Sequence, residues 1–537
     1  MNNEIKAFDT FGVMLDCSRN GVANIPFIEN FIGYLAKMGY NSLMLYTEET
    51  YEIPGEPYFG YKRGRFTQEE LRGLDAYAAE RGVKLIPCIQ TLAHLGQMLR
   101  WDRYSKVNDC ADILLCGEEK TYELIDEMFA SVAASYSSRL VHVGMDEAHM
   151  IGRGRYQDLH GHENHTEILL RHLERVAKIA EKYGFTLLMW SDMFFRLYEG
   201  YGYLEDEGFP GVPEEIRARI PKNVELVYWD YYFTEEEHYE KQFSFHDQVK
   251  KTGWFAAGGW TWLGFVPHNR YAMKTSGPAV RVCRERGVRN FLMTLWGDDG
   301  GECGRLSTLP ALWYAAELAR GNEDLTEIAA GFERTFGLPW EQFLLTDLPG
   351  TPSDEMKGAS DPDKGMLYDD PFLNFLGDGV REGGAEQYRL AAEKLEAYEG
   401  PEEFRYVFRT CAAAARALSV KYGLGMRTRE AYLAVDKKAL AALCDDYLAA
   451  ADALERLYLA LEGQWTLENK PQGFEVQDAR FGAILRRLAH CRERILAYLA
   501  GEAESIPELE EPVLPYRQDG PPYLENRWHN VITAGIL

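Results

Sequence analysis

Short apolar runs alternate with amphipathic segments of helical period from about Phe11 to Arg320. The apolar runs have the length of buried parallel strands, and the amphipathic segments place their apolar residues on one helical face. Eight such pairs can be counted, with strands predicted at 12–16, 42–46, 84–88, 140–144, 186–190, 225–229, 254–257 and 291–296. The helices predicted between them include 25–38, 67–81, 122–134, 167–183 and 277–286, several of them closed by glycine.

Eight consecutive strand-helix units indicate an α/β fold, a (β/α)8 or TIM barrel. The alternative is a doubly wound open sheet, which also alternates strands with helices. An open sheet that binds nucleotides would carry a glycine-rich phosphate loop after its first strand, and none follows here. The barrel is therefore the prediction.

The second part of the chain has a different composition. After a Pro- and Asp-rich passage at 339–371, it becomes rich in Ala, Leu, Glu and Arg, with long helices predicted at 386–397, 404–421, 428–461 and 480–499. We predict a catalytic barrel at 1–322, a connecting segment at 323–372 and an all-α C-terminal domain at 373–537. The simplest role for such a helical domain is packing or dimerisation.

Charge and composition exclude several classes of partner. The 58 Lys and Arg residues stand against 84 Asp and Glu, a net charge of −26, which argues against nucleic acid and anionic membranes as partners. The sequence has no basic segment followed by an apolar stretch at its start and no apolar run of about 18 residues, so neither export nor membrane insertion is expected. Nine scattered cysteines without a CxxC pair favour reduced thiols and a cytoplasmic location.

Candidate chemistry lies where the predicted strands end, because the active site of a (β/α)8 barrel is built from the loops that follow them. The segments after all eight strands carry carboxylates, aromatic rings or both. They supply Asp16 and Arg19; Tyr46, Glu48 and Glu49; Gln90 and His94; Asp146 and Glu147; Trp190 and Asp192; Trp229, Tyr231 and Tyr232; Trp260 and Trp262; and Trp296, Asp298, Asp299 and Glu302. Any one of these has an ordinary structural explanation, but their convergence predicts a pocket that could stack sugar rings or other flat apolar faces.

The fourth strand carries the most specific motif, LVHVGMDE. In a regular strand Asp146 and Glu147 would point in opposite directions, so both reach the pocket only if the strand has ended and the chain bends. Repulsion between two such carboxyl groups raises one pKa and leaves a protonated acid beside an ionised carboxylate. This pairing is the equipment of glycoside cleavage.

These motifs resemble glycoside hydrolase family 20, the β-N-acetylhexosaminidases. VHVGMDEAH resembles the family's H-x-G-G-D-E signature with Met145 in place of the second glycine, and MLDCSR, MWSD and LWGD resemble its motifs on strands one, five and eight. IPCIQTLAH resembles a further motif, with Gln90 where an acid is usual. The resemblance is closest to intracellular-type bacterial exo-β-N-acetylglucosaminidases with a helical C-terminal domain. Two features depart from it: no small α+β domain precedes the barrel, and Thr261 stands where a tyrosine is expected, with Tyr231 or Tyr232 as substitutes.

The resemblance implies exo-acting hydrolysis of terminal non-reducing β-linked N-acetylglucosamine, or N-acetylgalactosamine, from a small oligosaccharide or glycoconjugate. It implies a retaining mechanism in which the substrate's acetamido oxygen is the nucleophile. Glu147 is then the general acid, and Asp146 holds the acetamido group. The remaining predicted substrate contacts are Arg19, His94, Trp190, Trp229, Tyr231, Trp260, Trp296 and Asp298. Trp260 and Trp262 could equally form the pocket wall or simply pack within the seventh strand. No cofactor or metal is implied, and the relatives suggest a homodimer formed through the helical domain.

Two rival functions stay open at this point. A metal-dependent barrel hydrolase is suggested by five histidines in one region, His142, His149, His160, His162 and His165, although three of them lie in a Gly- and Asn-containing stretch typical of a solvated loop. A non-catalytic sugar-binding barrel would keep the aromatic pocket. It would have no use for a protonated acid, so the presence of both Asp146 and Glu147 argues against it.

Overall fold

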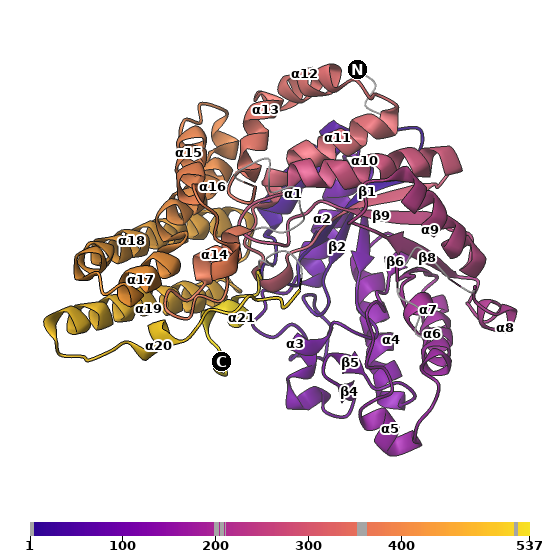
Figure 1. Ribbon diagram of the computed structural model, residues 1–537. Coiled ribbons are helices and arrows are strands. Elements are labelled where there is room, and N and C mark those ends of the chain that lie inside the picture. The colour runs from indigo at the N-terminus through magenta and orange to yellow at the C-terminus, as the bar shows by residue number, and fades with distance from the viewer. Residues whose placement is uncertain (1–4, 198–202, 205–208, 210, 352–361, 520–524) are drawn as a thin grey trace.

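A computed structural model describes residues 5–197, 203–204, 209, 211–351, 362–519 and 525–537. Its N-terminal part is a closed barrel of parallel strands in the order β1-β10-β9-β8-β7-β6-β3-β2 (Figure 1). The strands are β1 Thr10–Asp16, β2 Ser42–Tyr46, β3 Lys84–Cys88, β6 Leu140–His142, β7 Thr186–Trp190, β8 Val224–Trp229, β9 Trp254–Gly258 and β10 Asn290–Leu295. The predicted barrel is confirmed, and the open sheet is excluded because each of the eight strands pairs with two neighbours, so the sheet has no edge strand.

Helices surround the barrel. The longer ones are α1 Ile25–Met38, α2 Gln68–Ala79, α4 Glu119–Ser135, α6 His165–Glu181, α9 Glu236–Val249, α10 Asn269–Arg286 and α11 Leu309–Arg320; the shorter ones are α3 Gly96–Leu99, α5 Arg155–His160, α7 Met193–Arg196 and α8 Glu214–Arg217. Local signals set their ends: the Asn24 side chain accepts the Phe27 N–H at the start of α1, and Gly39 ends that helix with a φ of 85°.

The alternation of apolar residues along the strands builds two cores. On β1, Val13 and Leu15 face the surrounding helices, whereas Met14 faces inward and packs with Met44 and Ile86 inside the barrel. The barrel is therefore filled with side chains, and ligands have access only to its ends.

β6 and α10 are among the barrel elements whose bounds differ from the predicted ones. β6 ends at His142, two residues earlier than predicted, because the backbone leaves the extended region at Gly144. α10 begins eight residues before the predicted start at 277 and contains Gly277 and Pro278. Both residues are buried, so packing against neighbouring elements holds the helix together through a segment of low helix propensity. A small antiparallel hairpin, β4 Asn108–Cys110 with β5 Ile113–Leu114, lies in the loop after β3.

The C-terminal part is helical, as predicted. Its helices are α12 Leu325–Phe336, α13 Trp340–Phe343, α14 Pro362–Tyr368, α15 Gly384–Glu396, α16 Arg405–Lys421, α17 Leu424–Leu433, α18 Lys437–Glu468, α19 Glu475–Ala500, α20 Pro507–Glu510 and α21 Trp528–Ile532. Short 3₁₀ helices are η1 Asp102–Tyr104, η2 Asp298–Gly300, η3 Arg305–Thr308, η4 Leu344–Asp347, η5 Gly377–Gly379 and η6 Glu402–Phe404. Helices α12, α13 and α14 lie within the predicted connecting segment, of which 352–361 are outside the described residues.

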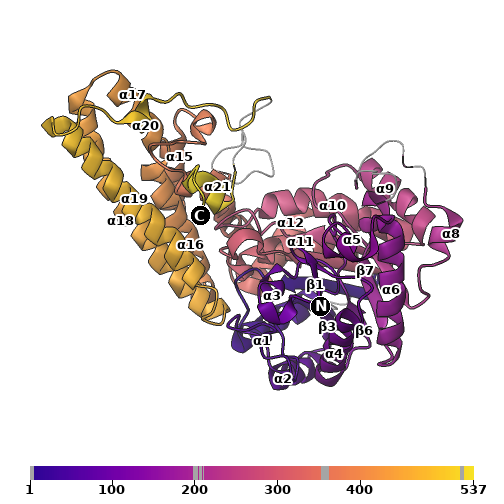
Figure 2. The same cartoon turned by 90° about the horizontal axis from the view of Figure 1, so that it is seen from below.

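The single long helix predicted at 428–461 is two helices, α17 and α18. The chain turns between them, with Val435 at a φ of 55°, and the Asp436 side chain accepts the Ala439 N–H to start α18. Helices α18 and α19 then run side by side along the outer part of the domain (Figure 2). Among the described helices, none combines the length and the apolar character needed to cross a membrane.

The helical domain holds one loop of the barrel in a network of buried charges. We call the group formed by Lys364, Gln477 and Arg480 with Asp299 and Glu302 the rim clamp. Arg480 pairs with Glu302 at 2.8 Å and with Asp299 at 3.0 Å, and Lys364 pairs with Glu302 at 3.2 Å. Gln477 donates to Glu302 at 3.2 Å. The loop after β10, which also carries Asp298, is thus fixed by residues from a second domain.

Candidate active site

A pocket opens at the carboxyl ends of the barrel strands. Its lining residues are Arg19, His94, Asp146, Glu147, Trp190, Trp229, Tyr231, Tyr232, Trp262, Trp296 and Asp298. Nine of the ten predicted site residues are among them, and Trp260 is the exception. Seven of the eight strand ends, all except that of β2, therefore bring together residues that are up to 279 positions apart in the sequence (19 to 298).

The backbone after β6 turns sharply, and this turn places Asp146 and Glu147. Gly144, Met145 and Glu147 have φ values of 69°, 67° and 52°, all in the left-handed region. A side chain at Gly144 would lie 1.9 Å from Gln90 Oε1, so only glycine fits there. Met145 adopts its left-handed conformation without that freedom, and its N–H donates to Gln90 Oε1 at 3.1 Å.

Asp146 is held as an anion by its neighbours. Gln90 Nε2 donates to Asp146 Oδ1 at 2.8 Å, and His94 Nε2 lies 3.1 Å from Asp146 Oδ2. Burial opposes ionisation, but the charge of His94 and these hydrogen bonds hold the pKa of Asp146 well below its usual range. The amide of Gln90 donates to the carboxylate and accepts from the backbone, which a carboxylate at the same position could not do.

His94 lies between the two carboxyl groups of the motif. Its Nε2 is 3.1 Å from Asp146 Oδ2 and 3.8 Å from Glu147 Oε2. Burial alone would lower its pKa, but the charge of Asp146 dominates and raises the pKa of His94 to about 9. The imidazole is therefore a cation at neutral pH.

We expect the contribution of His94 to stability to depend on pH. Its folded-state pKa of about 9 lies above its ordinary value, so the protonated ring stabilises the fold fully below about pH 6.5 and loses this contribution as the pH rises through 9. At pH 6 the free energy of unfolding of His94→Gln should be lower than that of the wild type by at most about 3 kcal/mol, and its melting temperature should be lower accordingly. This difference between the two proteins should disappear near pH 10. His160→Gln, at an exposed histidine outside the pocket, is the control. A difference in melting temperature between His94→Gln and the wild type that stays constant with pH would contradict the raised pKa of His94.

Glu147 projects into the open part of the pocket, with its side chain 44% exposed. Its N–H donates to Asp192 Oδ2 at 3.0 Å, and Arg196 Nη2 lies 3.7 Å from Glu147 Oε1. Burial and the negative charge of Asp146 raise the pKa of Asp192 to about 7. The expected difference in pKa between two neighbouring carboxyl groups therefore takes a different form. The pKa of Asp146 is lowered, and the nearby group with a raised pKa is Asp192, which follows the next strand, β7.

Aromatic rings form a large part of the pocket wall. Trp190 and Trp296 have ring centroids 6.2 Å apart, and Trp229 stacks on Tyr231 at 5.2 Å. Trp296 Nε1 donates to the Tyr231 hydroxyl at 3.1 Å, which fixes that oxygen in the pocket. This wall suits an apolar methyl group or the face of a pyranose.

Trp260 supports the wall from behind and does not line the pocket. It is 1% exposed, its Nε1 donates to the Tyr231 carbonyl at 3.0 Å, and it stacks on Trp262 at 4.5 Å. The backbone of Trp260 is left-handed, with a φ of 54°, and it is Trp262 that lines the pocket. Tyr232 also lines the pocket, and the YWDYY run after β8 was the sequence signal for it.

Arg19 and Asp298 lie at the polar side of the pocket. Arg19 Nη1 pairs with Asp16 at 3.0 Å, and Arg19 Nε lies 3.4 Å from Glu48. The Arg19 guanidinium also lies over the Tyr46 and Trp296 rings, 4.6 and 5.1 Å from their centroids. Burial raises the pKa of Asp298, with the Arg19 charge opposing it. Both side chains are positioned to hydrogen-bond hydroxyl groups.

The five histidines that suggested a metal site do not converge. His142 is buried beside Trp190, with ring centroids 4.3 Å apart, whereas His160 is at the surface, 3.7 Å from Glu118. Within the described ranges, the one group with metal-ligand spacing is His94, Asp146 and Glu147. A metal there would have to displace the proton from His94.

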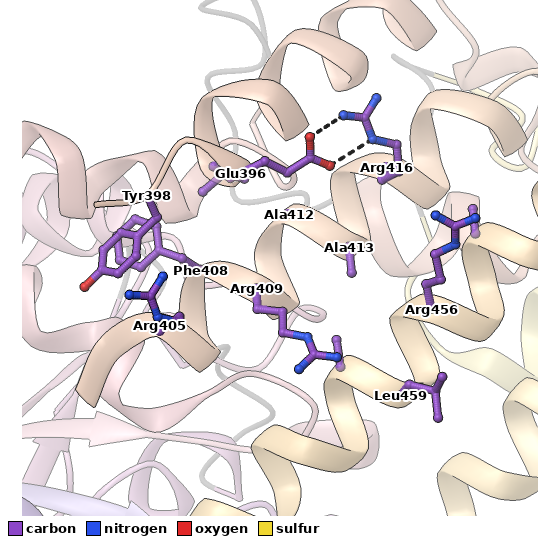
Figure 3. A pocket seen from close by; sticks show the side chains of 13 residues that line it. Glu396, Tyr398, Arg405, Phe408, Arg409, Ala412, Ala413, Arg416, Arg456 and Leu459 are labelled. Atoms are coloured by element: carbon purple, nitrogen blue, oxygen red, sulfur yellow. Dashed lines mark hydrogen bonds and ion pairs between the residues drawn. The ribbon is translucent and has the colours of Figure 1, made fainter. Parts of the chain in front are cut away.

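A larger cavity lies far from this chemistry, in the helical domain. It has a volume of about 500 Å³ between α15, α16 and α18. Apolar side chains such as Phe408 and Leu459 form part of its lining, together with Arg405, Arg409, Arg416 and Arg456 (Figure 3). It contains no cluster of carboxyl groups and no strand end, so it is not the candidate active site.

Comparisons with known proteins match both parts of the chain. The family model "Glycosyl hydrolase family 20, catalytic domain" matches residues 8–201, and "Glycoside Hydrolase 20C C-terminal domain" matches residues 342–527. Hexosaminidase D from Bos taurus is 26% identical over 205 residues, 36% of this chain and 55% of that protein. A β-hexosaminidase from Vibrio furnissii is 29% identical over 163 residues, 27% of this chain and 26% of that protein. The chain thus spans about half and about a quarter of the lengths of these relatives.

Similar solved structures include the family 20 exo-β-N-acetylglucosaminidase from Vibrio harveyi in complex with N-acetylglucosamine. It aligns with a TM-score of 0.46 and 17% identity, over 63% of this chain and 58% of that chain.

Proposed function

The chain belongs to glycoside hydrolase family 20, and from this premise we propose that it is an exo-acting β-N-acetylhexosaminidase. It removes terminal non-reducing β-linked N-acetylglucosamine, or N-acetylgalactosamine, from small oligosaccharides or glycoconjugates. The observation that carries this proposal is the pair Asp146 and Glu147, turned into one aromatic-walled pocket by the left-handed backbone after β6.

The proposed mechanism is substrate-assisted and retaining. The acetamido oxygen of the substrate attacks the anomeric carbon while Glu147 donates a proton to the departing oxygen, and the product of this step is a cyclic oxazolinium. Asp146 accepts the acetamido N–H and provides the counter-charge, which its lowered pKa supports. Glu147 then takes a proton from water, which opens the ring and restores the β-configuration.

The rest of the pocket recognises the terminal sugar. Trp190, Trp229 and Trp296 enclose the acetamido methyl group, and the Tyr231 hydroxyl donates to the acetamido oxygen in place of the tyrosine that Thr261 replaces. Tyr231 is suited to this role because its oxygen accepts the Trp296 N–H, which fixes the position of the hydroxyl in the pocket.

One assay separates this proposal from its rivals. We expect hydrolysis of a chromogenic aryl N-acetyl-β-glucosaminide, and we expect the rate to be the same after treatment with a chelator. Loss of activity with the chelator would favour the metal-dependent hydrolase, and binding of N-acetylglucosamine without turnover would favour the sugar-binding barrel.

Arg19→Ala tests recognition of the sugar hydroxyls. The change leaves those hydroxyls, Asp16 and Glu48 without their partner. The resulting fall in kcat/KM should correspond to a loss of roughly 2–4 kcal/mol in transition-state stabilisation. Arg19→Lys should restore only part of this, because the lysine ammonium cannot reproduce the planar fork of donors. A fall of less than about tenfold in Arg19→Ala would place Arg19 in a structural role.

We also propose a cytoplasmic homodimer. The nine cysteines all lie in the described residues and form no disulfide with one another, and eight of them are buried, which suits a reducing compartment. Dimerisation through the helical domain predicts a solution mass near twice 61.3 kDa, measurable by sedimentation equilibrium.

A further inference from the structure

The backbone of Glu147, the proposed general acid, needs contacts from outside its own loop. Its φ of 52° lies in the left-handed region, which a residue with a side chain rarely adopts unless the surroundings enforce it. Its side chain is 44% exposed, so packing alone does little to fix the carboxyl group. A general acid has to lie within hydrogen-bond distance of the departing oxygen, and its orientation therefore needs a source.

Asp192 provides the contact to the backbone. It lies two residues after the end of β7, and its side chain is fully buried. Its Oδ2 accepts the Glu147 N–H at 3.0 Å, so the strand next to β6 helps to set the backbone of Glu147. A hydrogen bond to an ionised acceptor is stronger than one to a neutral acceptor. The Asp192 carboxylate therefore opposes relaxation of the left-handed turn.

Arg196 links the same carboxylate to the side chain of Glu147. At the end of α7, Arg196 Nε donates to Asp192 Oδ2 at 3.1 Å. Its Nη2 lies 3.7 Å from Glu147 Oε1. The guanidinium also lies over the Tyr203 ring, 5.4 Å from the ring centroid, which limits its movement. One planar, rigid cation therefore faces both carboxyl groups at once.

These two residues are not placed to recognise the sugar. Neither Asp192 nor Arg196 is among the described residues that line the pocket. Asp192 has no exposed surface, and the side chain of Arg196 is 24% exposed. Any effect of the pair on the reaction therefore has to pass through Glu147.

We propose that Asp192 and Arg196 are positioning residues that hold Glu147 in the orientation for proton transfer, Asp192 through its backbone and Arg196 through its carboxyl group. The proposal rests on the proposed glycosidase function, in which Glu147 gives its proton to the departing oxygen. It assigns to the loop after β7 a part in proton transfer that is separate from sugar binding. Loss of the pair should therefore matter only where the departing oxygen needs that proton.

Two substrates with different leaving groups test this proposal. Methyl N-acetyl-β-glucosaminide releases an alkoxide and needs the proton, whereas an aryl N-acetyl-β-glucosaminide with a good phenolate leaving group does not. Asp192→Asn keeps the size of the side chain and removes its charge. It should lower kcat/KM on the methyl glycoside by about tenfold to 100-fold and leave the aryl glycoside within about threefold of the wild type.

The comparison is made at about pH 8, because the wild-type carboxyl group has to be ionised. Burial and the charge of Asp146 raise the pKa of Asp192 to about 7, against the opposing charge of Arg196. The other titratable groups that face it are Glu147 and the Tyr203 hydroxyl.

Arg196→Gln removes the contact to the carboxyl group of Glu147 and keeps the test available if Asp192→Asn does not fold. It should lower kcat/KM on the methyl glycoside by about threefold to 30-fold and leave the aryl glycoside within about threefold. Arg196→Lys should recover only part of the loss, because an ammonium group cannot face both carboxyl groups with a planar fork.

The matched control is Asp370→Asn, in a buried Asp–Arg pair of the helical domain. The side chains of Asp370 and Arg487 are 2% and 22% exposed, compared with 0% and 24% for Asp192 and Arg196. This change should leave kcat/KM on both substrates within about twofold of the wild type, whatever it does to stability.

Parallel losses on the two substrates in folded Asp192→Asn or Arg196→Gln would overturn the proposal, because a general structural defect does not depend on the leaving group. An unchanged rate on the methyl glycoside would overturn it as well. Failure of the proposed function gives a different result, since the wild type would then hydrolyse neither the methyl nor the aryl glycoside.

Discussion

Glu147→Gln is expected to lower kcat/KM on oligosaccharides by about 10³-fold and on an aryl glycoside with a good phenolate leaving group by less than about tenfold. An alkoxide leaving group needs the proton that Glu147 donates, whereas a phenolate departs without it. Because kcat/KM reports the steps up to the first irreversible one, the later role of Glu147 as a base does not obscure the comparison.

The matched control is Glu118→Gln, at a carboxylate that is 42% exposed compared with 44% for Glu147 and does not line the pocket. It should leave both substrates unchanged. If Glu147→Gln lowered kcat/KM equally on the two substrates, Glu147 would not be the general acid.

Asp146→Asn is expected to bind a thiazoline analogue of the cyclised intermediate about 100-fold or more weakly than the wild type does. Its affinity for N-acetylglucosamine should fall by less than about tenfold. The cationic ring of the intermediate loses its counter-charge, but the neutral product loses mainly one hydrogen-bond geometry. Isothermal titration of both ligands against the wild type and the variant measures the difference. The lowered pKa of Asp146 requires this carboxylate to be charged at the pH of the measurement.

A glucoside without the acetamide should be a very poor substrate for the wild type, since the nucleophile is then absent. Trapping of a covalent glycosyl-enzyme on any Asp or Glu by a fluorinated sugar would contradict substrate assistance and move the protein to an ordinary retaining mechanism.

Most of the barrel could be predicted from the sequence, because hydrophobic periodicity and strand length are local properties. The helix at 25–38 has the predicted bounds, and seven of the eight strands, all except β6, end at the predicted residue or within one residue of it. The early end of β6 was not visible, since the sequence LVHVG continues as an apolar strand. What ends it is a left-handed turn that includes Met145, a conformation that residue preference disfavours.

The residues of the candidate site could be named from the sequence, but the contacts among them could not. The strand-end rule gathers the carboxylates and indoles, yet the contacts that determine the state of Asp146 come from Gln90 and His94, more than fifty positions earlier. Likewise, the helical domain gave no sequence sign of its contact with the site. Arg480 reaches Glu302 across 178 positions, a pairing that only the tertiary structure brings about.

The left-handed backbone at the strand ends has a consequence for how this protein can change. Besides Met145 and Glu147, the non-glycine residues Glu48, His94, Trp260 and Asp299 have φ values from 44° to 57°, and all lie in loops that follow barrel strands. Conformations of this kind cost of order 1–3 kcal/mol each and persist where surrounding contacts enforce them. The rim is therefore where stability and activity conflict: a population selected for heat resistance alone would accumulate glycine or asparagine at these positions, and turnover would decline as the carboxyl groups lost their fixed orientation.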